Sequence, residues 1–402
     1  MSTLANTEKQ ITLEPRTGAR HLLENLLQTG ARIRRTASEL LGKLEEPPRP
    51  RLFLAGTGAV GSALLEQLSG LPPRERPHLS GLCNSRLLLI RERGIEAPAA
   101  LELLEQGRPT DWEAIIAYLT LTDPRQVIFV DATGSPDVAR IYDRLLGAGV
   151  NVVTPSKRAN TFEQSYYEEL HRTASEQGAS YRYETTVGAG LPILSTIGNL
   201  LRSGDTVTGI TGVLSGTMTF LFNQLQEGVP FSRAVVEARE RGYAEPDPRE
   251  DLSGEDVARK FLILARFLGY RLERNALQVE SLIPEELATA GLEEFLERLP
   301  DYDDYWQQKM RRAQRNGNTL RYAGSLSADG FVSVGVQEVP LSSPMGQLNN
   351  TDNLVSIRSR RYSQSPLVIQ GPGAGREVTA AGLLGDLFKV SAGFETSRRG
   401  RP

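Results

Sequence analysis

The stretch RLFLAGTGAVGSALLEQL, residues 51–68, decides the fold. It predicts a short apolar strand over residues 51–55 and a helix over SALLEQL, separated by a GxGxxG motif in the strand–turn–helix context that such a motif requires. The glycines permit a tight turn and a close backbone approach, and the N-terminus of the helix would face a pyrophosphate group. We therefore predict a dinucleotide site rather than a purely structural turn, formed by Gly56, Gly58, Ala59, Val60 and Gly61.

The segment after the predicted second strand, residues 79–83, indicates which dinucleotide is bound. Sites specific for NAD place an acidic residue there, on the ribose 2′-hydroxyl. This chain has Asn84-Ser85-Arg86 instead, and an arginine at that point could pair with a 2′-phosphate. We therefore predict NADP as the cofactor, with NAD as a second option. The alternative is that Arg86 is simply a solvated arginine.

Two further strands are predicted to bring polar loops to the same crevice. The apolar run Val127 to Val130 is typical of a central parallel strand and leads into Thr133 and Gly134. A strand over residues 150–154 leads into Lys157. Because ligands bind at the carboxyl ends of parallel strands, we assign Thr133, Gly134 and Lys157 to the cofactor crevice of a doubly wound α/β domain. Helices are predicted between the strands, over residues 112–119, 137–148 and 162–178.

Length and composition exclude several classes of protein. A chain of 402 residues has material for two or three domains, and its net charge of −3 gives no field that would attract nucleic acid or an anionic membrane. The N-terminus has no signal-peptide core, no apolar run is long enough to span a membrane, and one cysteine with three scattered histidines offers no zinc-ligand spacing. The single cysteine, Cys83, excludes an intrachain disulfide, so we expect a cytoplasmic protein.

A second stretch, GYAEPDPREDLSGEDVARK at residues 242–260, is predicted to carry the chemistry. Its prolines favour a loop, after which Ser253 would cap a helix over residues 255–268, with Asp256 completing an approximate capping box. Asp256 and Lys260 would then share one face of that helix, four residues apart. A capped surface helix with an ordinary ion pair would give the same pattern.

The charges of this stretch suit a small substrate that carries its own ammonium group. Its acidic side chains are Glu245, Asp247, Glu250, Asp251 and Asp256. Only six of the 46 basic residues in the chain are lysines, and both Lys157 and Lys260 stand directly beside an arginine. Since lysine can lose its proton at accessible pH and arginine in effect cannot, these two positions indicate amines that take part in chemistry.

The remainder of the chain predicts a second, α+β region. Strands are expected over residues 181–186, 207–214, 320–326, 331–336, 353–358 and 366–370. Helices are expected over residues 193–202, 216–226 and 231–241 and within the acidic segment 285–315. The stretch 373–390 should return to the first domain.

Taken together, these motifs resemble those of the homoserine dehydrogenases, particularly the form that makes up the C-terminal half of bifunctional aspartokinase–homoserine dehydrogenases. The resemblance runs in order over about residues 51–390 and is most specific from Ala238 to Lys260. The other matching stretches are GTGAVGSALLEQL at 56–68, VTPSKRAN at 153–160, YETTVGAGLPI at 183–193, LSGTMTFLFN at 214–223 and GPGAGREVTAAGLLGDL at 371–387.

The resemblance implies NAD(P)-dependent interconversion of L-homoserine and L-aspartate 4-semialdehyde, in threonine and methionine biosynthesis. The implied catalytic residues are Lys260, Lys157 and Asp256. We assign to the substrate site Glu245, Asp251, Asp256, Gly216 and Thr217. The implied ligands of a monovalent cation, usually sodium, are Glu184 and the carbonyl oxygens of Val187, Ala189 and Leu191. A further cofactor contact falls on Gly375.

The predicted domain organisation follows from these assignments. Residues 1–48 would be an N-terminal extension with one helix, and residues 49–180 plus 370–395 the nucleotide-binding domain. Residues 181–369 would bind substrate and form the contact of a homodimer. We expect no aspartokinase before residue 50 and no regulatory domain after the last helix, and the extension could dock a separate aspartokinase.

Three alternatives remain open. An aspartate-semialdehyde dehydrogenase would need a cysteine thiolate, and Cys83 lies on the adenosine side of the predicted crevice. A different amino-acid oxidoreductase would leave the stretch 238–260 unexplained. A non-catalytic NADP-binding subunit that associates with a separate aspartokinase would explain the extension but not the lysines and carboxylates.

Overall fold

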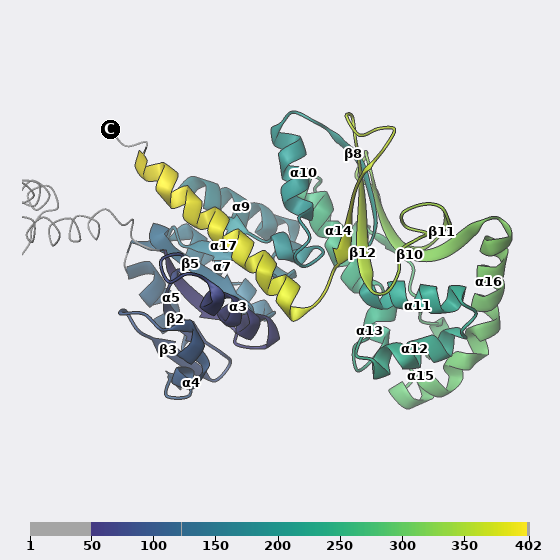
Figure 1. Ribbon diagram of the computed structural model, residues 1–402, viewed down its shortest axis with the longest axis horizontal. Coiled ribbons are helices and arrows are strands. Elements are labelled where there is room, and N and C mark those ends of the chain that lie inside the picture. Colours follow the sequence, from purple (N-terminus) through teal and green to yellow (C-terminus); the bar gives the residue numbers. More distant parts are fainter. Residues whose placement is uncertain (1–49, 122, 400–402) are drawn as a thin grey trace, which may run out of the picture. The chain divides into compact units, whose positions relative to one another are not determined.

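The GxGxxG stretch lies at the centre of a seven-stranded sheet of the Rossmann type. In the computed structural model, which describes residues 50–121 and 123–399, the strand order is β4-β3-β2-β1-β5-β6-β7 (Figure 1). Strands β1, β2, β5, β6 and β7 are parallel, whereas β3, near one edge, is antiparallel to both of its neighbours, β2 and β4. The strands are β1 (Arg51–Ala55), β2 (His78–Cys83), β3 (Leu87–Ile90), β4 (Arg108–Pro109), β5 (Val127–Asp131), β6 (Asn151–Val153) and β7 (Tyr181–Arg182).

Helices cover both faces of this sheet, so its central strands are buried throughout. Phe53 packs in one apolar cluster and its neighbours Leu52 and Leu54 in another, because successive side chains of a strand point to opposite faces. On the face of Leu52 lie α3 (Ala59–Gly70) and α4 (Ala100–Leu104). On the face of Phe53 lie α5 (Trp112–Leu121), α7 (Tyr142–Gly147) and α9 (Gln164–Gln177). The short helices α6 (Pro136–Ala139) and α8 (Arg158–Thr161) precede α7 and α9.

The last helix, α17 (Arg376–Arg399), returns to the first sheet, as predicted for the stretch 373–390. Its buried residues Leu383 and Leu387 share the apolar cluster of Leu52 and Leu54. At its first turn the carbonyl oxygen of Glu377 accepts a 2.8 Å hydrogen bond from a side chain of α3, next to which α17 is drawn in yellow in Figure 1. The nucleotide-binding part is thus built from two distant segments of the chain.

The second sheet is six-stranded, with the order β13-β12-β8-β10-β11-β9. Its pairs are antiparallel except for that of β9 and β11. The strands are β8 (Val207–Val213), β9 (Gln278–Val279), β10 (Asn318–Ser327), β11 (Val332–Pro340), β12 (Asp352–Ser359) and β13 (Leu367–Pro372). The strands predicted over residues 320–326 and 331–336 form an antiparallel pair, as do those predicted over 353–358 and 366–370. An α/β chain with a Rossmann-type domain and a second α+β domain is confirmed.

Helices of the second region pack beside this sheet and carry the predicted chemistry. Phe261 of α14 lies so close to Gly324 of β10 that a Cβ at Gly324 would be 2.2 Å from its ring. The helices are α10 (Ile193–Arg202), α11 (Gly216–Gln226), α12 (Phe231–Glu240), α13 (Arg249–Leu252), α14 (Glu255–Phe267), α15 (Leu292–Arg298) and α16 (Asp303–Arg315). The close contact fixes α14 on the sheet.

The cap predicted for α14 is wrong. The N-cap is Gly254, with φ of +75°, while Ser253 lies in the preceding helical turn that follows α13. A Cβ at Gly254 would stand 1.8 Å from the hydroxyl oxygen of Tyr322, so that position takes only glycine. The helix α13 was itself not predicted, because its residues lie between two prolines and a glycine.

The strand predicted over residues 181–186 is also wrong beyond its second residue. It ends at Arg182 and continues as a turn, Glu184–Thr186. The reason is that Glu184 turns its carboxylate to the start of α10, where it accepts hydrogen bonds from the N–H groups of Leu194 (2.7 Å) and Ser195 (2.9 Å). The sequence likewise gave no indication of the edge strands β3 and β4, and the helix predicted over 137–148 is divided into α6 and α7.

The predicted N-terminal extension, residues 1–48, and its one helix lie outside the described residues. Among the helices that the structure describes, none has both the length and the apolar character needed to cross a membrane.

Candidate active site

A cleft of about 670 Å³ is lined by the loop after β6, by the starts of α11 and α14, and by the glycine-rich loop before α17. These segments are far apart in the sequence, so the cleft is a product of the fold. The predicted site residues that it gathers are Lys157, Ala189, Gly216, Thr217, Glu245, Asp251, Asp256, Lys260 and Gly375. The other predicted cofactor and cation residues lie beyond its lining.

Asp256 bridges the two lysines in this cleft. Its Oδ2 lies 2.8 Å from the Nζ of Lys260, and its Oδ1 lies 3.3 Å from the Nζ of Lys157. Lys260 also donates a 2.6 Å hydrogen bond to the carbonyl oxygen of Leu214, just after β8. Lys260 is buried, whereas 46% of the Asp256 side chain and 29% of the Lys157 side chain face the open cleft. The structure thus brings together the carboxylate and the two amines.

The proton affinities of this trio depend on one another. Burial lowers the pKa of Lys157, and the ammonium of Lys260 lowers it further, while Asp256 acts in the opposite direction. Burial acts to raise the pKa of Asp256, but the ammonium groups of Lys260 and Lys157 outweigh burial and hold that pKa below its usual range. Asp256 therefore stays ionised, and Lys157 gives up its proton more readily than a surface lysine.

The cleft also has an acidic wall, which is ordered by hydrogen bonds to Asp251. The hydroxyl of Thr217 lies 3.0 Å from Oδ1, and the N–H of Glu245 donates to Oδ2 at 2.8 Å. Burial raises the pKa of Glu245, and the neighbouring charge of Asp251 raises it further. A ligand with a positive charge would relieve this repulsion.

Not every acidic residue of the stretch faces the cleft. Asp247 forms an ion pair with Arg249, 2.6 Å apart, and Arg249 also donates to the carbonyl oxygen of Ala290. This pair holds the start of α13 in place and leaves Asp247 outside the cleft lining, whereas Glu250 lies within it.

The glycine motif adopts the close approach that the sequence predicts. Gly56 has φ of +93°, and a Cβ there would lie 2.7 Å from the backbone of Ala132. A Cβ at Gly61 would lie 2.0 Å from the carbonyl oxygen of Gly56. At Gly58, the N-cap of α3, a Cβ would meet nothing within 4 Å. The turn is therefore packed on its inner side and open at the helix N-terminus, next to Ala59 and Val60.

A buried carboxylate that sequence reasoning missed supports the neighbouring loop. Asp131, at the end of β5, accepts hydrogen bonds from the N–H (2.7 Å) and hydroxyl (2.6 Å) of Thr133 and from the hydroxyl of Tyr142. Burial raises the pKa of Asp131, and the hydrogen bonds from Thr133 and Tyr142 counteract it. An acidic residue inside an otherwise apolar strand end was the signal available in the sequence. The network holds Thr133, and Gly134 after it, beside the glycine turn.

Arg86 lies in a hydrogen-bonded turn that follows β2. The side-chain oxygen of Asn84 accepts hydrogen bonds of 2.8 Å from the N–H groups of Arg86 and Leu87, and the carbonyl oxygen of Arg86 accepts one of 3.0 Å from Thr110. The backbone of Arg86 is thereby fixed while its side chain is exposed. This arrangement leaves the guanidinium able to meet a phosphate.

The residues predicted to hold a cation lie on one loop, but two of them are already engaged. Glu184 is buried, its carboxylate caps α10, and the Nζ of Lys389 lies 3.5 Å from it. The carbonyl oxygen of Leu191 accepts a 2.8 Å hydrogen bond from Ile193. In the part of the chain that the structure describes, no cluster of three or more His, Cys, Asp or Glu could hold a metal ion. A cation here would therefore depend on the carbonyl oxygens of Val187 and Ala189.

Cys83 is not placed for catalysis. It is buried at the end of β2, and burial raises the pKa of its thiol to about 12. A thiolate nucleophile therefore does not form there at neutral pH.

A Rossmann-type sheet with an open glycine turn, beside a cleft that holds two amines and a carboxylate, defines a nicotinamide-dinucleotide-dependent oxidoreductase. Two family models match the chain, "Homoserine dehydrogenase, NAD binding domain" over residues 56–184 and "Homoserine dehydrogenase" over residues 192–388. The chain belongs to the homoserine dehydrogenase family, which confirms the predicted resemblance.

Relatives of two kinds are similar to this chain. It is 37% identical over 350 residues to the bifunctional aspartokinase/homoserine dehydrogenase of Haemophilus influenzae, covering 84% of this chain and 42% of that protein. It is 38% identical over 370 residues to the homoserine dehydrogenase of Paracoccidioides brasiliensis, covering 84% of this chain and 97% of that protein. The chain therefore spans less than half the length of the bifunctional relative.

Solved structures confirm the fold. A Candida auris protein of unknown function has a TM-score of 0.80 at 34% identity, covering 85% of this chain and 98% of that one. A hyperthermophilic archaeal homoserine dehydrogenase in complex with NADPH has a TM-score of 0.66 at 23% identity, covering 85% and 98%.

Proposed function

We propose that this chain catalyses the NAD(P)-dependent interconversion of L-homoserine and L-aspartate 4-semialdehyde. The observation that carries the proposal is the Lys157–Asp256–Lys260 trio, which lines one cleft together with the acidic pair Glu245 and Asp251. Homoserine has an ammonium group for the acidic wall and a primary alcohol for the amines. A non-catalytic nucleotide-binding subunit would not need this arrangement, and nothing in the comparisons favours one.

The proposed division of labour follows from the contacts of each side chain. Glu245 binds the substrate ammonium, and Asp251, which is held by Thr217, keeps Glu245 in place. Lys260 receives the proton of the alcohol, since Asp256 and the carbonyl oxygen of Leu214 fix its Nζ. When bound, the nicotinamide cofactor accepts the hydride from the alcohol carbon.

Lys157 has a supporting role. Because of its lowered pKa, the amines of Lys157 and Lys260 are not both protonated. Its lowered pKa means that, of the two coupled amines, one is neutral at a pH where isolated lysines are still charged. Neutral Lys157 can take a proton from the Lys260 ammonium through Asp256, which lies between them, and the Nζ of Lys260 can then accept the proton that the alcohol releases. Lys157 and Lys260 thus act as one unit with Asp256 between them.

The direct test is an assay of L-homoserine oxidation, followed by the absorbance of the reduced nicotinamide. We expect oxidation that depends on homoserine and NADP and that is stimulated by Na⁺ or K⁺ over a buffer without alkali cations. A folded protein that binds NADPH but does not oxidise homoserine in any of these buffers would contradict the proposed activity and favour a binding subunit.

The pH dependence of this reaction gives a second test, through Asp256. Because a neutral amine is needed, kcat for oxidation should rise with pH and reach half its maximum below the usual lysine pKa of about 10.4. Asp256 raises the pKa of Lys157, so Asp256→Asn should lower that pKa and move the rise in kcat to lower pH, besides lowering its height. Asp247→Asn, in the same stretch but outside the cleft, should leave the profile unchanged. A rise displaced to higher pH in Asp256→Asn would contradict the assigned coupling.

We propose NADP as the preferred cofactor because Arg86 stands where an NAD-specific site has a carboxylate. The glycine turn and the loop of Thr133 and Gly134 would hold the dinucleotide, and Gly375 would contact it from the cleft lining.

Arg86→Ala should raise KM for NADP by about tenfold, the size of one exposed charge-assisted hydrogen bond, and leave KM for NAD unchanged. Arg91 follows β3, at the opposite end of that strand from Arg86, so Arg91→Ala is a matched control that should change neither value. Equal losses for NADP and NAD in Arg86→Ala would contradict a role on the 2′-phosphate.

A monovalent cation, with sodium as the first choice, is proposed on Glu184 and the carbonyl oxygens of Val187, Ala189 and Leu191. The donors are all oxygens, as a hard cation requires. Glu184 and Leu191 already have other partners, so the cation would bind mainly through the carbonyl oxygens of Val187 and Ala189. The comparison of buffers with and without alkali cations tests this site.

The remaining proposals concern domains, location and assembly. We propose that the two sheets mark the nucleotide-binding domain and the substrate and dimerisation domain, that the enzyme is a cytoplasmic homodimer, and that residues 1–48 dock a separate aspartokinase. The full-length bifunctional relatives, which carry both activities in one chain, motivate the last point. A chain lacking residues 1–48 that kept its dimerisation, its kinase association and its kinetics would contradict the docking role.

A further inference from the structure

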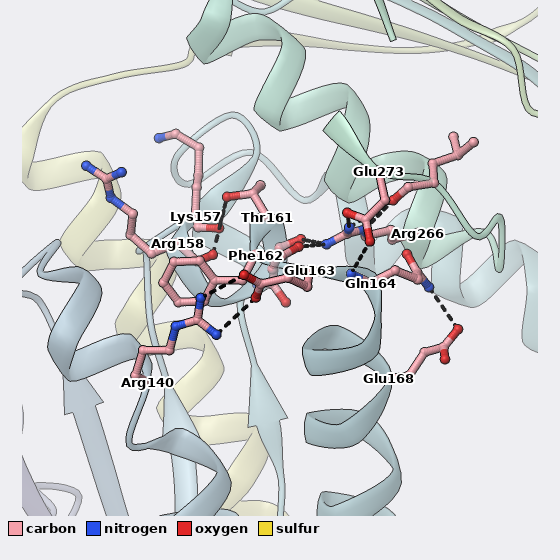
Figure 2. A network of polar contacts seen from close by, with 12 residues as sticks. Arg140, Lys157, Arg158, Thr161, Phe162, Glu163, Gln164, Glu168, Arg266 and Glu273 are labelled. Atoms are coloured by element: carbon pink, nitrogen blue, oxygen red, sulfur yellow. Dashed lines mark hydrogen bonds and ion pairs between the residues drawn. The ribbon is translucent and has the colours of Figure 1, made fainter. Parts of the chain in front are cut away.

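Arg266 lies in the C-terminal turn of α14, and every N–H donor of its guanidinium makes a hydrogen bond (Figure 2). Its Nη1 donates to the carbonyl oxygens of Asn160 (2.9 Å) and Phe162 (2.8 Å). Its Nε (3.1 Å) and Nη2 (2.8 Å) donate to the carbonyl oxygen of Leu272, and Nη2 also reaches the carboxylate of Glu273 at 3.3 Å. A guanidinium has five N–H donors, and these contacts account for all of them.

The burial of this charge indicates that Arg266 serves to position other residues and not to add stability. The Arg266 side chain is 0% exposed, and burial lowers its pKa. A buried ion gains little stability over an apolar side chain of the same volume, because desolvation offsets most of the attraction to its partners. A planar fork that grips several carbonyl oxygens does, however, fix the backbones that carry them.

The backbone segment to which Arg266 donates hydrogen bonds begins at Lys157, a candidate catalytic residue. Asn160 belongs to α8, whose N-cap is Lys157, and Phe162 follows its last residue. Within this turn the carbonyl oxygen of Lys157 accepts a 3.0 Å hydrogen bond from the hydroxyl of Thr161, which Figure 2 shows beside it. The segment 157–162 is therefore one closed turn, and a grip on its end also sets the position of its start.

Helices α8 and α14 are consequently held together at two separated points. One is the contact between Lys157 and Asp256 in the cleft, and the other is the grip of Arg266, ten residues further along α14, or about 15 Å. A single contact would fix a distance, whereas two fix an orientation as well. We propose that Arg266 is a positioning residue, which holds Lys157 in register with Asp256 and Lys260 without touching the substrate.

Glu273 extends the same grip to the next helix. Its Oε2 faces Arg266, and its Oε1 accepts a 2.8 Å hydrogen bond from the N–H of Gln164, at the start of α9. Loss of Glu273 removes one acceptor of Arg266 and leaves the four contacts to carbonyl oxygens, so Glu273→Ala is a partial and milder version of the loss of Arg266.

The inference rests on the proposed function, but its first test does not require that activity. In Arg266→Lys the buried charge remains while the fork is lost, so the turn after Lys157 is released and Lys157 becomes more solvated. The pH dependence of Lys157 acylation by an amine-specific reagent, followed by mass spectrometry of the peptide, reports its pKa directly. We expect this pKa to rise towards the usual lysine value in Arg266→Lys, and to rise by less in Glu273→Ala.

The kinetic counterpart is a loss of kcat without a loss of cofactor binding. A displacement of about 1 Å can cost roughly a hundredfold in rate, so we expect kcat of Arg266→Lys to fall by about ten- to a hundredfold while the NADPH dissociation constant is unchanged. Arg140→Met is the matched control, since Arg140 stacks 3.9 Å from the ring centre of Phe162 and pairs with Glu163, on the α8–α9 connection rather than on α14. It should leave both the Lys157 titration and kcat unchanged.

The possible outcomes separate this inference from the proposed function. A shifted Lys157 titration in a protein without homoserine activity would keep the positioning role and reject the substrate. A folded Arg266→Lys with a wild-type Lys157 titration and wild-type kcat would overturn the positioning role. If Arg266→Lys does not fold, a wild-type titration and wild-type kcat in Glu273→Ala would show that this cluster serves stability alone, and would also overturn it.

Discussion

Lys260→Met should lower kcat for homoserine oxidation by about 10²–10⁴-fold, the range for removal of a general acid–base, while NADPH still binds. Lys260 is the buried member of the trio, and both Asp256 and the carbonyl oxygen of Leu214 hold its Nζ in a fixed position. Methionine keeps the length and apolar stem of the side chain, so the packing of α14 should survive. The measurements are steady-state kcat and a fluorescence titration with NADPH.

Lys309→Met is the control for that substitution. Lys309 lies on α16, where its Nζ is 3.7 Å from Glu280 and 5.3 Å from the ring centre of Trp306, so it lies outside the cleft. Its loss should leave kcat unchanged. Near-normal turnover in Lys260→Met would refute the role of Lys260 and leave Lys157 as the group that receives the proton.

Gly61→Ala should weaken NADPH binding by about ten- to a hundredfold. A Cβ at Gly61 would lie 2.0 Å from the carbonyl oxygen of Gly56, which belongs to the backbone and cannot rotate away, so the turn and the start of α3 must separate. Displacing one N–H group from a phosphate costs roughly 1.5–3 kcal/mol, which corresponds to a loss of about ten- to a hundredfold in affinity. NADPH titration measures the loss, and a thermal midpoint shows whether the fold is retained.

Gly70→Ala is the matched control, because it makes the same substitution at the last residue of the same helix. A Cβ at Gly70 would meet nothing within 4 Å, so its affinity for NADPH should equal that of the unmodified protein. A folded Gly61→Ala protein with unchanged affinity would mean that the pyrophosphate does not sit on this turn.

Local sequence patterns predicted those helices and strands that are determined by a few neighbouring residues. The strand and helix around Gly56 are fixed by a few adjacent residues, and the Asp256–Lys260 pair follows from helical spacing alone. The position of Lys157 after a strand, together with the family resemblance, predicted one site for Lys157, Glu245 and Asp251, and these residues line one cleft. Their chemical roles remain predictions.

The features that escaped prediction depend on residues remote in the chain. Gly254 replaces Ser253 as the cap of α14 because the hydroxyl of Tyr322, on β10, leaves no space for a side chain there. Arg266 looks like any polar residue on a helix until the fold brings the carbonyl oxygen of Asn160, 106 positions away, to its guanidinium. No local pattern encodes such contacts.

The return of α17 to the first sheet has a consequence for synthesis on the ribosome. Leu383 and Leu387 complete the apolar layer that begins with Leu52 and Leu54, so the nucleotide-binding domain cannot close until α17 has emerged. Until then, the growing polypeptide exposes an unfinished apolar face while the intervening sheet can already fold as an insertion. The nascent chain should therefore be most vulnerable to aggregation and most in need of chaperones just before α17 leaves the exit tunnel.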